Sequence, residues 1–149
     1  MPSTPKSTSA LELSITSDPA QLAPARKSIE SFCLSHGLDS KATDDMGLCV
    51  NEAIANITRH AYAGRTDRPI VLRAIDASEA VEVSLRDWGN GVNPAELDVK
   101  PKDPLVPGGL GLVCLRSLMD DVRFEPQADG MRLTLVKRKT PATKESSHG

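Results

Sequence analysis

The sequence is poor in aromatic residues, and this scarcity limits what the chain can bind. Of its 149 residues, only Phe32, Tyr62, Trp88 and Phe124 are aromatic, so the core must be built mainly from Leu, Val, Ile and Ala. Proteins that bind single-stranded nucleic acid commonly stack the bases on clustered aromatic rings. The scattered aromatic residues of this chain provide no such platform. Direct binding of nucleic acid is therefore not expected.

Long apolar runs and a large excess of one charge are also missing. No stretch approaches the roughly 18 apolar residues of a membrane span, and residues 1–10 lack the apolar centre of a signal peptide. Lys and Arg number 18 and Asp and Glu number 20, which gives a net charge of −2. This balance indicates neither a basic nucleic-acid surface nor an acidic tail. We expect a cytoplasmic protein that does not contact a membrane.

Closely spaced cysteines are absent as well. Cys33, Cys49 and Cys114 lie far apart in the sequence, whereas zinc and redox motifs usually place two cysteines within a few positions. We expect all three to be reduced, buried thiols. A chain of this length buries roughly two-thirds of its unfolded surface on folding, so it needs neither a disulfide nor a metal to be stable.

The sequence does contain the pattern of one α+β domain between two polar tails. Residues 1–9 and 140–149 are polar and predict flexible ends, which leaves 10–139 as the folded domain. Strands are predicted where apolar residues alternate, and helices where they recur every three or four positions. The order of these elements predicts a two-layer α/β sandwich, with helices on one face of a mainly antiparallel, mixed sheet. The expected strands are 11–15, 70–75, 81–85, 122–124 and 131–136, and the expected helices are 19–36, 40–62 and 110–119.

The first candidate motif lies on the long helix predicted over 40–62. On an ideal helical wheel the apolar stripe is centred near Ala53, and Glu52 and Asn56 fall together at its edge, one turn apart. Arg59 lies on the same flank. A carboxylate and an amide in this position would face the margin between the helices and the sheet. The same pattern also fits a solvated polar edge of a helix.

Two glycine-containing motifs follow. The segment 87–91, Asp-Trp-Gly-Asn-Gly, comes directly after a predicted strand; its Asp can accept a hydrogen bond from an amino group, and its glycines allow close approach to a flat ligand. The segment 108–112, Gly-Gly-Leu-Gly-Leu, opens a helix whose free N–H groups suit phosphate oxygens. A Pro-rich loop, 92–107, joins the two, with one helical turn expected near 94–97. Taken alone, each motif fits an ordinary turn or a flexible hinge equally well.

The three motifs occur together and in one order, and in that order they resemble the Bergerat-fold, or histidine-kinase-like, ATP-binding domain of GHKL ATPases and kinases. Within that superfamily the chain resembles bacterial anti-sigma factors of the serine-protein-kinase type, the RsbW and SpoIIAB group. The stretches 50–62, 87–92, 109–121 and 133–137 carry the resemblance, which covers roughly 11–138. No dimerisation domain with an acceptor histidine precedes the motifs, so a two-component sensor kinase is not expected.

The resemblance implies a role for each residue of the motifs. Glu52 would be the general base for a substrate serine, and Asn56 would coordinate Mg²⁺. Asp87 would bind the adenine amino group, and residues 92–108 would form a lid over ATP. The other implied nucleotide contacts are Gly89, Gly91 and Val92 at the base, Gly109, Leu110, Gly111 and Leu112 at the phosphates, Arg59 at a phosphate or a partner, and Thr134 beside the adenine pocket.

The resemblance further implies an ATP-dependent protein-serine kinase that phosphorylates a STAS-domain anti-anti-sigma partner and regulates a sigma factor. ATP or ADP and Mg²⁺ would be its cofactors, and the chain would form a homodimer. The alternative is a non-catalytic module that binds ATP or ADP and uses the nucleotide to control docking of a partner. The predicted lid is short for an anti-sigma kinase, which keeps this alternative open. A purely structural domain would bind no ATP.

Several other residues are expected to have structural roles only. His60 falls within the predicted apolar stripe and is expected to be a packed, hydrogen-bonded side chain, and Trp88 is expected to pack under the lid. Lys137, Arg138 and Lys139 form a short basic run that is expected to be solvated.

Overall fold

The computed structural model describes residues 10–89 and 111–139, with 111–114 described by their backbone. The predicted tails, 1–9 and 140–149, and the helical turn expected near 94–97 lie outside the described residues. The elements are β1 (Ala10–Thr16), the 3₁₀-helix η2 (Pro19–Gln21), α1 (Leu22–Ser35), α2 (Ser40–Asn56), the π-helix η3 (Ile57–Ala61), β2 (Pro69–Asp76), β3 (Ala80–Asp87), α4 (Gly111–Leu118), β4 (Asp121–Gln127) and β5 (Gly130–Arg138).

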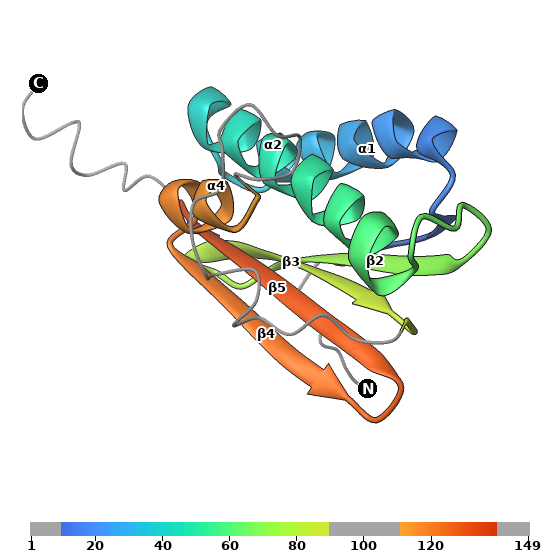
Figure 1. Ribbon diagram of the computed structural model, residues 1–149. Coiled ribbons are helices and arrows are strands. Elements are labelled where there is room, and N and C mark those ends of the chain that lie inside the picture. Colours follow the sequence, from blue (N-terminus) through green and yellow to red (C-terminus); the bar gives the residue numbers. More distant parts are fainter. Residues whose placement is uncertain (1–9, 90–110, 140–149) are drawn as a thin grey trace, which may run out of the picture.

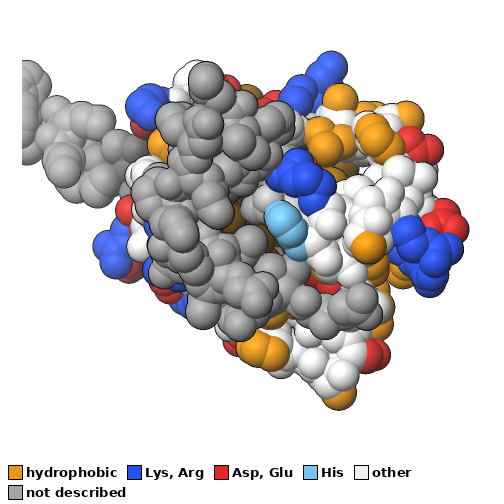
Figure 2. Space-filling model, viewed as in Figure 1, with side chains coloured by type: hydrophobic (Ala, Val, Ile, Leu, Met, Phe, Trp, Pro, Cys, Tyr) orange, Lys and Arg blue, Asp and Glu red, His pale blue; other side chains and the backbone are white. Residues whose placement is uncertain are grey.

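The five strands form one sheet in the order β1-β2-β3-β5-β4. The helices α1, α2 and α4 all lie on one face of it, so the molecule has two layers (Figure 1). This arrangement confirms the predicted α+β sandwich. Every described strand pair is antiparallel, so the parallel pairing implied by a mixed sheet is not found among these strands. On the part of the surface that is not grey in Figure 2, hydrophobic side chains form small separate groups.

The sheet buries one face because its apolar side chains alternate with polar ones. In β3, Val81, Val83 and Leu85 are all fully buried, and the residues between them are half-buried. Leu85 lies between Leu72 of β2 and Leu133 of β5 in the register, so the apolar positions of neighbouring strands line up across the sheet. This continuous apolar face packs against the helices and forms the core.

The segment predicted as a helix over 19–36 forms η2 followed by α1. Asp18 accepts a hydrogen bond from the backbone N–H of Ala20 at 2.9 Å, and Pro19 supplies the fixed φ that a helix start favours. The helix ends at His36, and Gly37 follows with φ +101°, a left-handed conformation that glycine adopts at low cost. The predicted start and end of this helix are confirmed.

The helix α2 crosses the sheet beside α1 and carries the first motif (Figure 1). Its start is capped by Asp39, whose carboxylate accepts from the N–H of Ala42 at 2.8 Å. Gly47 lies against the Glu30 side chain of α1, so the two helices approach closely at this point. The buried residues of α2 recur with helical spacing and contact the sheet.

The single helix predicted over 40–62 is corrected by the structure. The α-helix ends at Asn56, and the chain continues to Ala61 as the π-helix η3. The N–H of Tyr62 donates to the carbonyl of Ile57 at 2.9 Å, five residues back, which shifts Tyr62 relative to an unbroken α-helix. Apolar spacing did not reveal this change, because the apolar residues of 40–62 also fit an unbroken α-helix.

The basic run 137–139 is also corrected, because two of its three side chains are tied into the fold. Lys137 donates to the carbonyl of Leu118 at 2.6 Å and lies 3.5 Å from the carboxylate of Asp45. Lys139 donates to Asp76 at 2.7 Å. Lys137 thereby supplies a cation at the C-terminal end of α4, where the helix dipole favours one. Arg138 alone of the three is exposed.

The expected thiols agree with the structure where it describes them. Cys33 and Cys49 are fully buried thiols, and burial raises the pKa of the Cys33 thiol to about 12. The side chain of Cys114 lies outside the described residues. None of the helices in 10–89 and 111–139 is long and apolar enough to cross a membrane.

Candidate functional site

Asp87 lies at the end of an apolar strand face. It follows Val81, Val83 and Leu85 on the helix-facing side of β3, and only 2% of its surface is exposed. Its neighbours in the register are Ile70 of β2 and Met131 of β5. The carboxylate therefore lies between the two layers, among apolar neighbours on both adjacent strands.

The surroundings of Asp87 make it a strong hydrogen-bond acceptor. Burial raises the pKa of its carboxyl group, and a hydrogen bond from the backbone N–H of Gly89 to Oδ1, 3.0 Å long, together with the nearby charge of Arg86, partly offsets this effect. A hydrogen-bond donor that reaches a buried carboxylate stabilises it more than it would an exposed one, because burial has removed the carboxylate from water. The amino group of a bound base is such a donor, as the resemblance implies.

The turn after Asp87 is held against the end of η3. A Cβ on Gly89 would collide with the backbone carbonyl of Ala61, so this position requires glycine. The hydroxyl of Tyr62 accepts from the N–H of Trp88 at 2.8 Å and donates to the carbonyl of Pro69 at 2.6 Å. In this structure the contact that requires glycine at position 89 is with η3, a reason that the motif alone did not suggest.

The carboxylate and the amide of the first motif lie one helical turn apart at the end of α2. Asn56 is buried, with 7% of its surface exposed, and Glu52 lies one helical turn before it. Glu52 Oε1 is buried and has no hydrogen-bond partner among the described residues. Because an unpaired buried oxygen is costly, this atom is suited to a ligand or substrate that supplies a donor. Of the two open interpretations, a fully solvated polar edge does not fit Asn56, which is buried, or the Oε1 atom of the half-buried Glu52.

Arg59 is bonded to the residue that the resemblance assigns to the metal. Its Nη2 donates to Asn56 Oδ1 at 3.0 Å. The described residues contain no group of three or more His, Cys, Asp or Glu side chains placed to hold a metal ion. Amide and carboxylate oxygens suit Mg²⁺, which takes most of its remaining ligands from phosphate and water. Asn56 thus fits a magnesium bound through a nucleotide, provided that the guanidinium of Arg59 moves off its oxygen.

Two side chains expected to be packed are exposed instead. His60 lies on the solvent side of η3, because the π-helical turn changes which residues face the core. Trp88 is 41% exposed, and the guanidinium of Arg86 lies 4.5 Å from the centre of its ring. Arg86 is itself fixed by an ion pair with Asp129 at 2.6 Å.

The predicted place of Thr134 beside the adenine pocket is corrected. Thr134 pairs with Ser84 of β3, whereas Asp87 pairs with Met131. Because side chains alternate along a strand, Thr134 points to the face opposite the helices and Met131 points to the same face as Asp87. The residue that adjoins Asp87 on β5 is thus a methionine, which the pattern of threonine and leucine in 133–135 did not suggest.

The third motif is described only in part. Gly111 is the first residue of α4, and Leu112 lies in its first turn, as expected for a glycine-rich helix start. The remaining predicted site residues, Gly91, Val92, Gly109 and Leu110, and the predicted lid, 92–108, lie outside the described residues.

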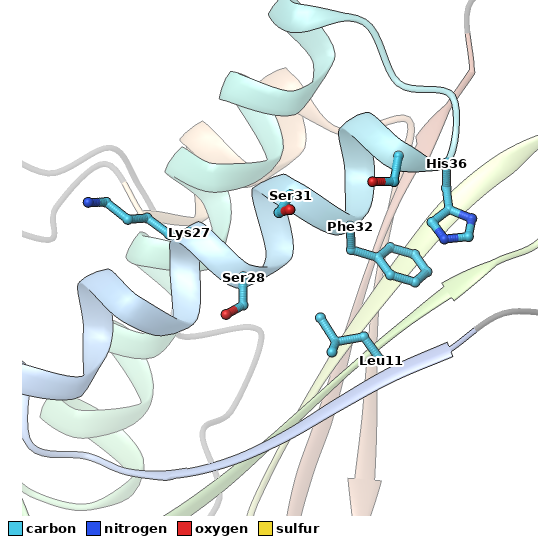
Figure 3. A pocket seen from close by; sticks show the side chains of 7 residues that line it. Leu11, Lys27, Ser28, Ser31, Phe32 and His36 are labelled. Carbon is cyan, nitrogen blue, oxygen red and sulfur yellow. The ribbon is translucent and has the colours of Figure 1, made fainter.

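Two pockets differ in how they relate to the motifs. A pocket of about 470 Å³ lies between α1 and β1, where Leu11 points toward Phe32 and the Phe32 ring stacks on His36 (Figure 3). It contains none of the motif residues. A smaller pocket of about 320 Å³ is lined by Tyr62, Trp88 and Gly89 and adjoins the second motif.

Comparison with known proteins decides the family. The family model described as "Histidine kinase-like ATPase domain" matches residues 15–137. The chain belongs to this family. The resemblance to GHKL ATPases predicted from the three motifs is therefore confirmed, and membership implies that this histidine kinase-like ATPase domain binds a nucleotide.

Curated relatives narrow the comparison. The chain is similar to "Serine-protein kinase RsbW" of Listeria monocytogenes, with 27% identity over 123 residues that cover 76% of this chain and 78% of the relative. It is also similar to the protein of the same name from Bacillus pumilus, with 25% identity over 137 residues that cover 85% of this chain and 84% of the relative.

A solved structure supports the fold. The chain resembles a structure titled "The crystal structure of the RsbU and RsbW domains of Rv1364c from Mycobacterium tuberculosis", with a TM-score of 0.64 and 20% identity. The match covers 89% of this chain and 33% of that one, so this chain corresponds to about a third of the solved protein.

Proposed function

We propose that this histidine kinase-like ATPase domain is a protein-serine kinase of the anti-sigma type. It would bind Mg-ATP between α2 and the end of β3, phosphorylate a serine of a STAS-domain partner and regulate a sigma factor. The names of the RsbW relatives support the kinase activity. The observation that carries the proposal is the buried, unpartnered Oε1 of Glu52, one turn from Asn56.

Asp87 and the end of α2 divide the nucleotide between them in this proposal. The buried carboxylate of Asp87 accepts from the adenine amino group, because no other acidic side chain in the described part of the chain is fully buried. Asn56 holds Mg²⁺, which when bound neutralises charge on the phosphates. Arg59 leaves Asn56 Oδ1 and turns toward the phosphates, since a guanidinium and Mg²⁺ repel each other at one oxygen.

Glu52 acts on the substrate serine. Its carboxylate accepts the proton of the serine hydroxyl as the serine oxygen bonds to the γ-phosphorus and the bond to the bridging oxygen breaks, which leaves ADP and phosphoserine. A carboxylate with an unpaired buried oxygen is suited to this step because it does not have to break another hydrogen bond first. Homodimerisation and a cytoplasmic location, both expected from the sequence, remain parts of the proposal.

The test uses the purified protein, Mg-ATP and a candidate STAS-domain partner protein. The wild type is expected to produce phosphoserine. Glu52→Gln should bind Mg-ATP as the wild type does but transfer phosphate at least about 100-fold more slowly, because general-base catalysis is lost. Glu30→Gln, in α1, is the matched control and should retain transfer.

The outcomes separate the proposal from the non-catalytic alternative. Tight nucleotide binding and nucleotide-dependent association with the partner, without phosphoryl transfer by the wild type, would select a binding module. The bond from Arg59 to Asn56 is the observation that favours this alternative, because it occupies the oxygen assigned to Mg²⁺. Absence of Mg-ATP binding in calorimetry would contradict both.

A further inference from the structure

The hydroxyl of Tyr62 joins three segments that are distant in the sequence. Tyr62 follows η3, donates to Pro69 at the start of β2 and accepts from the backbone N–H of Trp88 just after β3. The side chain is 5% exposed. Burial raises the pKa of the Tyr62 hydroxyl above its usual range, so the group keeps the proton that it donates to Pro69.

These bonds fix the turn that carries the Asp87 carboxylate. The N–H of Trp88 is held by Tyr62, and the next N–H, of Gly89, donates to Asp87 Oδ1 at 3.0 Å. The backbone of Gly89 also rests on the carbonyl of Ala61, the residue before Tyr62. Ala61 and Tyr62 therefore fix the position of residues 88–89, and the N–H of Gly89 in turn fixes the carboxylate of Asp87.

The π-helical turn is what brings Tyr62 to this place. In η3 the N–H of Tyr62 bonds to Ile57 rather than to Thr58, so the tyrosine is displaced relative to a continuous α-helix. The same five residues begin immediately after Asn56. The element η3 thus begins next to Asn56, which the resemblance assigns to Mg²⁺, and ends next to Tyr62, which holds the turn after Asp87.

We propose that Tyr62 is a positioning residue for base recognition, which sets the preference for adenine by fixing the turn from Asp87 to Gly89. This inference rests on the proposed nucleotide site. With the hydroxyl in place, the carboxylate has one direction and selects a base with an amino group. Without it, the N–H of Trp88 loses its acceptor, the turn loosens, and the carboxylate adapts to more than one base.

The test compares ATP with inosine triphosphate, which has a carbonyl oxygen where adenine has its amino group. Calorimetry on the full chain should show that the wild type prefers ATP by about tenfold or more, the value of one hydrogen bond to a charged group. In Tyr62→Phe the preference should fall to about threefold or less. The matched control is Thr58→Val, which removes a hydroxyl of η3 that donates to the carbonyl of Ile54 in the last turn of α2 at 3.0 Å, and it should keep the wild-type preference.

A second measurement needs no nucleotide. The backbone amide of Trp88 should exchange with solvent deuterium more slowly in the wild type and in Thr58→Val than in Tyr62→Phe. Faster exchange of Trp88 in Tyr62→Phe, together with a lowered ATP preference, supports the inference. An unchanged preference in a folded Tyr62→Phe variant overturns it. If the wild type binds neither nucleotide, the proposed function fails, and the exchange at Trp88 still decides whether Tyr62 holds the turn.

Discussion

At the scale of single residues, the buried carboxylate of Asp87 provides an acceptor for a ligand and lowers the stability of the fold. Burial is the largest influence on it and raises its pKa above 3.8, the ordinary value of an aspartate. A raised pKa means that the folded state disfavours the charged form, so the cost is fully present at pH values above the raised pKa. It disappears as the pH falls below 3.8, where the carboxyl group is protonated in both states.

Replacing this charge is therefore expected to stabilise the protein and weaken nucleotide binding. Asp87→Asn should melt at a higher temperature than the wild type at pH 7, and the gap should close toward pH 3.5. Its affinity for ATP should fall about tenfold or more, because the acceptor for the amino group is lost. Asp44→Asn, at an exposed position of α2, is the control. A lower melting temperature for Asp87→Asn at pH 7 would contradict the prediction.

The sequence predicts those candidate site residues whose proposed role follows from their own side-chain type, and it does not predict a residue whose proposed role depends on a contact made in the fold. Glu52, Asn56 and Asp87 were predicted from helical spacing and from the end of an apolar strand, and these patterns fix which face a residue occupies. Tyr62 offered no comparable signal, because its role comes from Trp88 and Pro69, which only the fold brings to it. Thr134 was expected beside the adenine pocket from the resemblance, whereas the alternation of side chains along β5 places Met131, and not Thr134, on the face of Asp87.

At the scale of elements, α2 has the first motif near its C-terminal end and a stabilising cap, Asp39, at its N-terminal end. The carboxylate of Asp39 accepts from the N–H of Ala42 at 2.8 Å and so satisfies one of the N–H groups that the first turn leaves free. Glu52 lies more than three turns further along. The cap and the site are therefore separate functions of one helix.

Removing the cap should lower stability without changing nucleotide binding. Asp39→Ala is expected to reduce the free energy of unfolding by about 1 kcal/mol, measured by urea denaturation. The Kd for Mg-ATP, measured where both proteins are folded, should stay the same. Asp44→Ala, in the same helix, should cost less than Asp39→Ala. An equal loss in both variants would show that the cap bond contributes nothing beyond the change to alanine.

Most helices and strands could be predicted from the sequence, but the π-helix η3 could not. All five strands and the helices α1, α2 and α4 follow from the period of their apolar residues, with boundaries shifted by a few positions. The π-helical turn does not, and the contacts that accompany it, of Ala61 with Gly89 and of Tyr62 with Trp88, join segments that are distant in the sequence. The prediction that His60 is buried was wrong because it assumed an unbroken α-helix, in which His60 would lie within the apolar stripe.

At the scale of the whole molecule, one ionic cluster ties the helical layer to the sheet far from the motifs. Asp76, at the end of β2, accepts from Lys139 at 2.7 Å and from the N–H of Ser78 at 3.0 Å, and lies 3.0 Å from His36 Nδ1 at the end of α1. The bond from Lys139, followed by those from His36 and Ser78, lowers the pKa of Asp76 to about 2, against the opposing effect of burial. The cluster thus joins the end of α1, the β2–β3 turn and the end of β5.

Because of this cluster, part of the free energy of unfolding should depend on pH. Because the pKa is lowered in the folded state, the contribution of Asp76 is fully present above 3.8 and is lost as the pH falls through about 2. Asp76→Asn should therefore be less stable than the wild type at pH 6, by at most ~2 kcal/mol. The difference should shrink toward zero at pH 2, since other carboxyl groups titrate alike in both proteins.

The control for this prediction is Asp67→Asn. The hydrogen bond from Arg65 also lowers the pKa of Asp67, but that side chain is 69% exposed and its ion pairs lie at 3.4 and 3.8 Å. Water and salt screen such pairs, so Asp67→Asn should have the stability of the wild type at every pH. Urea denaturation of the three proteins between pH 6 and pH 2 decides the matter. A difference between the wild type and Asp76→Asn that does not change with pH would mean that the cluster stabilises the fold by packing rather than by charge.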